Sequence, residues 1–276
     1  MYEPKNYLAL CLDPVHIGTG GYRLGRVDMS IVREPATGIP KIPGTSLAGV
    51  VRAYAEMVKN EDNSLPEVET IFGTPKKQGM LRFYDARIVL FPVSSQLGTV
   101  WVSTAERMRP CVAAGECGEN VLPAEPQDEN KVIVLKGMAK INPVNLGWLL
   151  LETEPIKNKE EKKQLIQALS FVGRLIMVSD KLFHHLVNDH LEVRTSVEIE
   201  DETGAAKGGA LFTYEAIPRG TVLGFEVAID FRRGDGVSGE DIENLLGKVF
   251  GGLKILGIGG MGTRGFGRIE VLNFPH

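Results

Sequence analysis

The spacing of apolar residues divides the chain into short strands and a few amphipathic helices. Apolar runs and alternating positions predict strands at 7–12, 29–32, 81–91, 98–104, 175–178, 192–199, 222–231, 254–258 and 267–272. Apolar residues at helical spacing predict helices at 47–58, 105–110, 159–170, 180–190 and 238–250. In the first helix one apolar face is expected to pack in the core: Leu47, Val50, Val51, Tyr54, Ala55 and Val58.

Two segments depart from this core pattern. Residues 111–146 contain prolines and a cluster of acids, which predicts an irregular surface insertion. A turn at 202–204 joins the strand at 192–199 to a return strand that begins at Gly209, so 192–219 is expected to form a hairpin. Without these insertions the element order is β-α-β-β-α-β. We therefore expect one α+β domain over 1–276 with a ferredoxin-like or RRM-like core, although periodicity alone leaves the topology open.

The overall charge does not favour a free nucleic-acid-binding protein. The net charge is −4 and the pI is about 5.8, whereas such proteins are usually basic. The distribution is uneven: 16–54 holds five basic residues against two acidic ones, and 112–130 holds five acidic residues and no lysine or arginine. These opposite patches suit head-to-tail assembly or polyanion binding, and they equally suit two solvated loops.

The number of cysteines and the lengths of the hydrophobic runs indicate which cellular compartment to expect. Cys11, Cys111 and Cys117 are too few for a zinc site and lack a nearby histidine, so reduced structural thiols are expected. The first apolar run, 7–12, is too short for a signal peptide. No segment approaches the ~20 apolar residues of a membrane span. We expect a cytoplasmic protein with no membrane partner.

Residues 13–59 concentrate the features that indicate a binding site. A glycine-rich turn with Gly18, Gly20, Gly21 and Gly25 follows an apolar strand, and an isolated carboxylate, Asp28, follows the turn. The segment 40–46 then stops a strand and starts a helix, whose first turn Thr45 or Ser46 can cap. That helix end offers free N–H groups to an anion.

A second glycine-rich loop, 257–267, contains a literal G-x-G-x-x-G from Gly257 to Gly262. A dinucleotide fold needs a helix directly after this motif, but a strand is predicted there, and the lysine of a phosphate-binding P-loop is missing. Two interpretations stay open. The loop lies along a phosphate backbone, helped by Arg264 and Arg268, or it is a turn that closes the sheet.

Together these motifs resemble the RAMP superfamily of CRISPR proteins, in particular the repeated backbone subunit of the type III-B (Cmr) effector complex. The matching segments are 14–18, 27–28, 31–34, 37–40, 42–47, 81–93 and the loop 257–267. The resemblance implies a thumb-like hairpin at 192–219 that reaches from one subunit onto RNA held by its neighbour. It also implies binding of a CRISPR guide RNA and cleavage of complementary target RNA at regular intervals, in antiviral defence. The implied partners are both RNAs, other copies in a helical filament, and other Cmr complex subunits.

The resemblance also implies roles for individual residues. Asp28 corresponds to the carboxylate that the family needs for cutting, His16 to a histidine that orients phosphate or shuttles a proton, and Glu215 to a helper in the hairpin. A lone carboxylate cannot build a two-metal site. Asp28 is therefore expected to assist attack by the RNA 2′-hydroxyl, as a general base or as ligand of a divalent ion, Mg²⁺ or Mn²⁺. From the sequence alone, Asp28 could equally be a turn-forming residue.

The remaining implied contacts are with RNA. They comprise Gly18, Gly20, Arg26, Lys41, Ser46, Arg52, Gly260, Gly262 and Arg264. The chain departs from its relatives at Ala48, where many carry a lysine, and at 213–216, where a Glu-x-Tyr pair is not reproduced in register. His184, His185 and His190 form no metal motif and are interpreted as surface or packing residues.

Three alternative functions stay open: a scaffold subunit without cleavage activity, a guide-processing endonuclease of the same superfamily, and a nucleotide-cofactor oxidoreductase.

Overall fold

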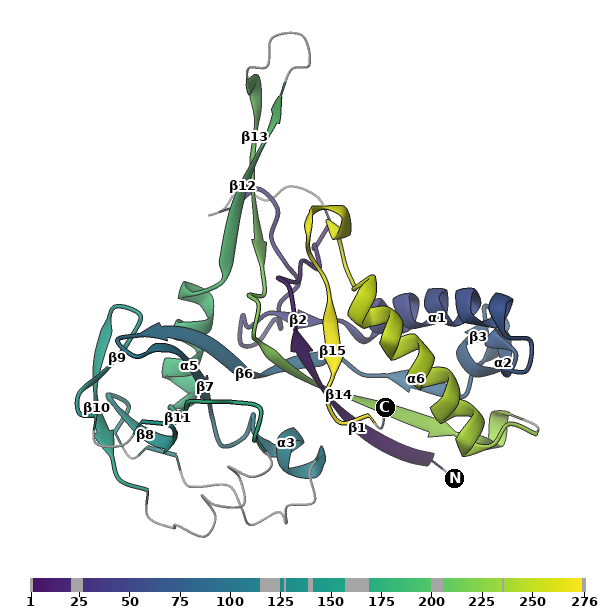
Figure 1. The fold of residues 1–276 in the computed structure, drawn as a ribbon, viewed down its shortest axis with the longest axis horizontal. Coiled ribbons are helices and arrows are strands. Elements are labelled where there is room, and N and C mark those ends of the chain that lie inside the picture. The colour runs from purple at the N-terminus through teal and green to yellow at the C-terminus, as the bar shows by residue number, and fades with distance from the viewer. Residues whose placement is uncertain are drawn as a thin grey trace.

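A computed structural model describes residues 2–20, 27–114, 125–126, 128–138, 141–156, 169–199, 206–234 and 236–274. Most strands join one sheet in the order β15-β1-β14-β6-β7-β11-β8-β10-β9, and β2 and β5 pair with β6 and β14 (Figure 1). Their bounds are β1 Tyr2–Cys11, β2 Lys41–Ile42, β5 Leu81–Phe83, β6 Ala86–Ser95, β7 Gly98–Ser103, β8 Lys131–Lys136, β9 Val144–Leu146, β10 Leu149–Glu154, β11 Leu175–Met177, β14 Val222–Asp230 and β15 Ile269–Val271. The expected mixture of helices and strands is confirmed, with a core that is mostly sheet.

Four of these strands, β15-β1-β14-β6, are each antiparallel to their neighbours. Helix α1 (Gly44–Glu61) lies between β1 and β6 in sequence, and α6 (Gly239–Ile255) joins β14 to β15. Tyr7 of β1 contacts Phe225 of β14 and Phe250 of α6, with ring centroids 5.3 and 5.2 Å apart. The two helices pack on each other, and Tyr54 of α1 donates a hydrogen bond to the carbonyl oxygen of Gly257.

The helix predictions hold where apolar spacing and capping agree. Helix α5 (Asp180–Asp189) buries Leu182, Phe183, Leu186 and Val187 on one side. Ser238 caps α6 in a reciprocal capping box with Asp241. The strand predicted at 254–258 is wrong, because Leu253 continues the buried face of α6 and the helix runs on to Ile255.

Several strand and loop predictions also need correction. The strand at 81–91 is broken between β5 and β6, and 29–32 forms only isolated bridges. Between α1 and β5 the chain forms α2 (Val68–Phe72) and the short hairpin of β3 (Gly73–Thr74) and β4 (Lys77–Gln78), where the sequence pattern predicted no helix or strand. The helix predicted at 105–110 is α3 (Arg109–Ala114).

The predicted insertion at 111–146 is not irregular throughout, because β8 and β9 belong to the sheet. Residues 115–124, 127 and 139–140 lie outside the described part, as does 157–168, where a helix was expected. Cys11 and Cys111 are buried free thiols, as predicted, and burial raises the pKa of Cys111 to about 12; Cys117 lies outside the described residues. Among the described helices, none has the length and apolar character needed to span a bilayer.

One hairpin projects from the body of the molecule (Figure 1). Strands β12 (Glu192–Ile199) and β13 (Ala206–Ala216) pair antiparallel, with Thr195 opposite Thr213. We call residues 212–217 the hairpin base. It lies where β13 returns to the body and where Ile217 exchanges backbone hydrogen bonds with Val15.

Candidate nucleic-acid interface

The two glycine-rich segments of the sequence lie against each other. The N–H of Gly260 donates to the carbonyl oxygen of His16 at 2.9 Å, and that of Gly267 donates to Pro14 at 2.9 Å. Gly259 has a φ of +88°, and a Cβ there would lie 2.5 Å from the carbonyl oxygen of His16. Only glycine fits this approach without displacing the backbone. The second loop therefore does more than close the sheet: it packs on the segment that carries His16.

The second loop also packs on the hairpin base. Phe266 is buried against Tyr214, with ring centroids 5.5 Å apart. The guanidinium of Arg194 lies 4.6 Å from the ring centroid of Phe266, and that of Arg264 lies 5.6 Å from the ring centroid of Phe212. The hairpin and both glycine segments thus meet at one place, although they are far apart in the sequence.

Asp28 lies at this meeting point and is half-buried, not in the hydrophobic interior. Its Oδ2 accepts hydrogen bonds from the backbone N–H of Thr213 at 2.7 Å and from the hydroxyl of Thr213 at 2.9 Å. These bonds favour the ionised carboxylate and hold the pKa of Asp28 below its usual value. Asp28 is therefore a partly accessible anion fixed to the hairpin base.

His16 is buried beside the same strand. Its Nδ1 lies 2.6 Å from the carbonyl oxygen of Glu215, and because a carbonyl only accepts, Nδ1 carries the proton. In the neutral ring Nε2 is then the acceptor, and it lies 3.1 Å from where a Cβ on Gly18 would be. The predicted histidine therefore faces the first glycine segment.

Glu215 is tied to a cation. Its Oε1 accepts from Arg33 at 2.7 Å, and the side chain of Glu215 is only 9% exposed. Arg33 also donates to the carbonyl oxygen of Gly38 and to the side chain of Asn188 on α5. The other carboxylate oxygen, Oε2, is buried and has no partner in the described structure. This geometry anchors the hairpin base to the 33–38 segment; a helper role in cleavage stays a prediction.

Some residues that were predicted to contact RNA already bind other groups of the protein. Lys41 forms an ion pair with Asp85 at 2.5 Å. Arg52 binds the side chain of Glu56 and the carbonyl oxygen of Gly73, each at 3.0 Å. Thr45 and Ser46 do not cap α1 as predicted, because the helix already begins at Gly44 and both lie inside its first turn. Asp85 accepts from the N–H of Gly44 at 2.8 Å, so this carboxylate occupies one of the N–H groups expected to bind an anion.

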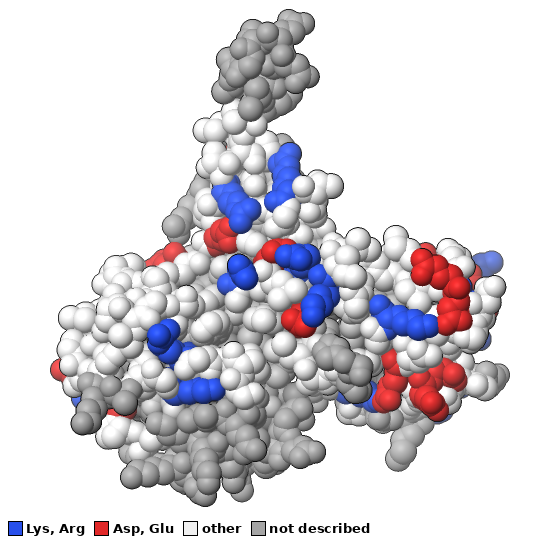
Figure 2. Space-filling model, in the orientation of Figure 1, with Lys and Arg blue, Asp and Glu red and all other residues white. Residues whose placement is uncertain are grey.

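Other residues that were predicted to contact RNA are exposed to solvent. Gly18, Gly20, Gly260, Gly262 and Arg264 are exposed. Arg268 forms an ion pair with Asp13, which sequence reasoning did not foresee. Arg26 lies outside the described residues. Figure 2 shows lysine and arginine side chains on the hairpin and on the body below it, with acidic side chains between them.

Metal ligands are sparse in the described part of the chain. No group of three or more histidine, cysteine, aspartate or glutamate side chains gathers there. Asp28 offers one carboxylate, and its Oδ2 is already bonded to Thr213. The described residues alone thus do not form a protein-held metal site.

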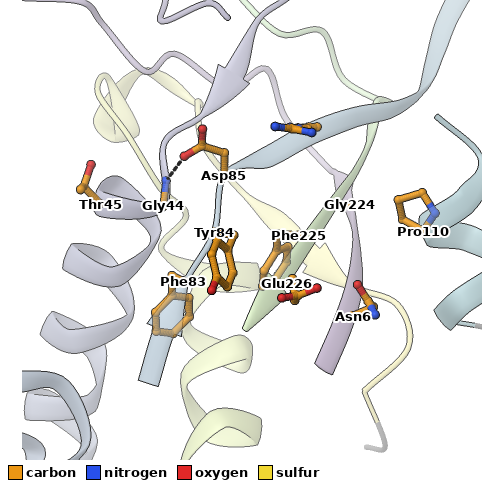
Figure 3. Close-up of a pocket in the computed structure, with 11 residues that line it drawn as sticks. Asn6, Gly44, Thr45, Phe83, Tyr84, Asp85, Pro110, Gly224, Phe225 and Glu226 are labelled. Atoms are coloured by element: carbon orange, nitrogen blue, oxygen red, sulfur yellow. Dashed lines mark hydrogen bonds between the residues drawn. The ribbon is translucent and has the colours of Figure 1, made fainter. Parts of the chain in front are cut away.

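A separate cleft of about 550 Å³ lies between the start of α1 and α3 (Figure 3). Tyr84, Asp85 and Glu226 line it with Asn6, and none of the predicted site residues does. The cleft lies where the structure interrupts the strand predicted at 81–91, at Tyr84 and Asp85, so sequence reasoning did not mark it.

Comparison with known proteins identifies the family. The profile of the RAMP superfamily matches residues 9–270. The chain is 31% identical to the CRISPR system Cmr endoribonuclease Cmr4 of Pyrococcus furiosus over 94% of this chain and 92% of that protein. A chain in the structure of the type III-B Cmr-beta complex bound to cognate target RNA has the same fold, with a TM-score of 0.74, 17% identity and coverage of 98% and 96%. The oligomeric Cmr4 of Pyrococcus furiosus aligns with a TM-score of 0.66, 25% identity and 97% coverage of both chains. The chain therefore belongs to the RAMP superfamily and is a relative of the Cmr4 proteins.

Proposed function

We propose that this protein is the repeated backbone subunit of a type III-B CRISPR complex, which binds guide RNA and cleaves the paired target RNA. The observation that carries the proposal is the convergence of Asp28, His16 and two glycine-rich segments on the base of a projecting hairpin. The similarity to a named endoribonuclease over 94% of the chain supports the activity. The partners are guide RNA, target RNA, further copies in a filament and other Cmr subunits, in the cytoplasm.

The fold supports this assignment. The antiparallel order β15-β1-β14-β6, with α1 and α6 as connections, supports the proposal of a ferredoxin-like core. The hairpin of β12 and β13 is the candidate for the thumb that reaches onto RNA held by a neighbouring subunit. Its exposed apolar side chains, Val193, Val197 and Leu211, suit contact with bases or with another protein surface.

RNA binding in this proposal does not depend on base sequence. Exposed glycines of both segments allow close approach of a sugar–phosphate backbone, and Arg264 adds a positive charge beside the second loop. Target choice then comes from pairing with the guide, while the protein reads the shape of the duplex. Lys41 and Arg52 contribute less than predicted, because both already bind protein groups.

Cleavage is proposed to use the target RNA's own 2′-hydroxyl. The 2′-oxygen bonds to phosphorus as the bond to the 5′-oxygen breaks, which leaves a 2′,3′-cyclic phosphate and a 5′-hydroxyl. Thr213 bonds only Oδ2 of Asp28, so Oδ1 is the oxygen to orient or deprotonate the 2′-hydroxyl. His16 is the candidate to orient the phosphate or to shuttle a proton. The lowered pKa of Asp28 keeps it ionised near pH 7 but weakens it as a base.

A divalent ion, Mg²⁺ or Mn²⁺, would offset the charge on the phosphate when bound. Mg²⁺ commonly uses one or two carboxylates together with substrate phosphates and water. Since Asp28 is the one predicted ligand in the described chain, RNA phosphate oxygens and water would have to supply the remaining ligands. Metal dependence is therefore a proposal about the assembled complex with RNA.

The proposal is tested with a target RNA that carries one 2′-deoxynucleotide. The complex is assembled with this chain and guide RNA, and the cuts in an unmodified target are mapped first. Replacing the nucleotide 5′ of one cut with its 2′-deoxy form is expected to slow that cut by at least about a hundredfold, because the nucleophile is gone. Cuts at the other positions should continue and provide the internal control. Persistence of the modified cut would contradict the proposed chemistry, and an intact unmodified target would contradict the proposed activity.

A further inference from the structure

We infer that Thr213, at the base of the hairpin, is the positioning residue for the Asp28 carboxylate. The inference rests on the proposed function, because it assigns a role in the same cleavage site. It follows from contacts between two residues that are separated by 185 positions in the chain. Thr213 acts through Asp28 and is not proposed to touch RNA.

Three hydrogen bonds join the two residues. The backbone N–H and the hydroxyl of Thr213 both donate to Oδ2 of Asp28, at 2.7 and 2.9 Å. The backbone N–H of Asp28 donates in return to Oγ1 of Thr213 at 3.1 Å. The hydroxyl thus fixes both the side chain and the backbone of Asp28. An aspartate without such bonds rotates about two side-chain torsions, and loses the fixed geometry that catalysis needs.

The strand that carries Thr213 is itself held along both of its edges, by Met29 on one and by β12 on the other. Met29 donates its N–H to the carbonyl oxygen of Thr213 at 3.0 Å, and Glu215 donates its N–H to Met29 at 3.1 Å. On the far side, Thr213 pairs with Thr195 of β12. Because these contacts fix the strand, Thr213 holds the carboxylate of Asp28 in a fixed position.

The same strand, β13, also holds His16, the second candidate residue of the site. The carbonyl oxygen of Glu215 accepts from Nδ1 of His16, and the carboxylate of Glu215 binds Arg33. Residues 213–215 therefore set both the carboxylate and the imidazole from one backbone segment. Because β13 continues into the projecting hairpin, the contacts that hold both site residues lie at the base of that hairpin.

The test compares matched variants of the assembled complex. Thr213→Val keeps the shape of the side chain but removes the hydroxyl, whereas Thr213→Ser keeps the hydroxyl. Thr99→Val is the control, because Thr99 is an exposed threonine of β7, opposite Ser94, and belongs neither to the hairpin nor to the glycine-rich segments. In single-turnover assays we expect Thr213→Val to slow cleavage by about tenfold to a hundredfold, with guide and target affinity unchanged. Thr213→Ser and Thr99→Val should cleave near the wild-type rate.

A wild-type rate in Thr213→Val, or an equally slow Thr213→Ser, would overturn the inference. A double-mutant cycle that measures melting temperatures of the isolated full chain tests the coupling of Thr213 to Asp28 without a cleavage assay. Thr213→Val should lower the melting temperature when residue 28 is aspartate, and much less in an Asp28→Ala background. Equal lowering in both backgrounds would show that the two residues are not coupled, and would overturn the inference. A wild-type complex that does not cut would instead count against the proposed function.

Discussion

Replacing Asp28 with alanine is expected to slow target RNA cleavage by about a hundredfold to ten-thousandfold, the range associated with a positioned acid or base. The change removes the carboxylate at the meeting point of the hairpin and the glycine segments. It leaves the surrounding core intact, because Asp28 is half-buried and its carboxylate binds Thr213 at the hairpin base. The measurement is the single-turnover cleavage rate of the assembled complex. Guide RNA content and complex mass should not change.

Two control variants sharpen this result. Asp28→Asn keeps the size of the side chain and can still accept from Thr213, so it isolates the loss of charge. Asp13→Ala removes another carboxylate nearby in sequence, which binds Arg268 and not the hairpin base, and it should leave the cleavage rate close to wild type. If the Asp28→Ala complex assembles and still cuts at the wild-type rate, the carboxylate is not catalytic and the scaffold alternative is favoured.

Replacing Arg33 with alanine is expected to lower the free energy of unfolding by about 3 kcal/mol, as found when one partner of a buried ion pair is removed. Arg33 binds the carboxylate of Glu215, whose side chain is 9% exposed and whose Oε2 already has no partner. Without Arg33 that buried charge is left uncompensated. Urea unfolding of the isolated full chain measures the loss.

The matched control for this prediction is Lys181→Ala. Lys181 and Glu129 form an ion pair whose side chains are 67% and 62% exposed. Such exposed ion pairs contribute about 0–1 kcal/mol to the free energy of unfolding. A similar loss in both variants would show that the Arg33 pair behaves as a surface pair and does not anchor the hairpin base.

The sequence predicts local structure well where periodicity and end signals agree. Helices α5 and α6 lie close to the predicted ranges 180–190 and 238–250, because their apolar residues recur at helical spacing. Residues 254–258 were misassigned because a short apolar run fits a strand as well as the last turn of a helix. Strand β8 was missed because its apolar run, 131–136, lies among prolines and acids that favour loops.

The candidate site is predictable only in part. Glycine density and an isolated carboxylate mark Asp28 and the second loop, and the family resemblance adds His16. The contacts that position these residues connect distant segments: Thr213 with Asp28, Glu215 with Arg33, and Asp85 with the start of α1. No local pattern encodes such pairs, since they depend on how the strands are ordered in the sheet. For the same reason the sequence did not reveal that Lys41 and Arg52, both predicted to contact RNA, have protein partners.

The proposed chemistry requires Asp28 to lie beside the bond that is cut. The structure of the assembled complex with guide RNA and a target that carries a 2′-deoxynucleotide at a mapped cut would show whether it does. We expect a carboxylate oxygen of Asp28 within about 3–5 Å of the modified 2′-position, directly or through one water or ion. A separation beyond about 10 Å, too far for contact through a single water, would contradict it.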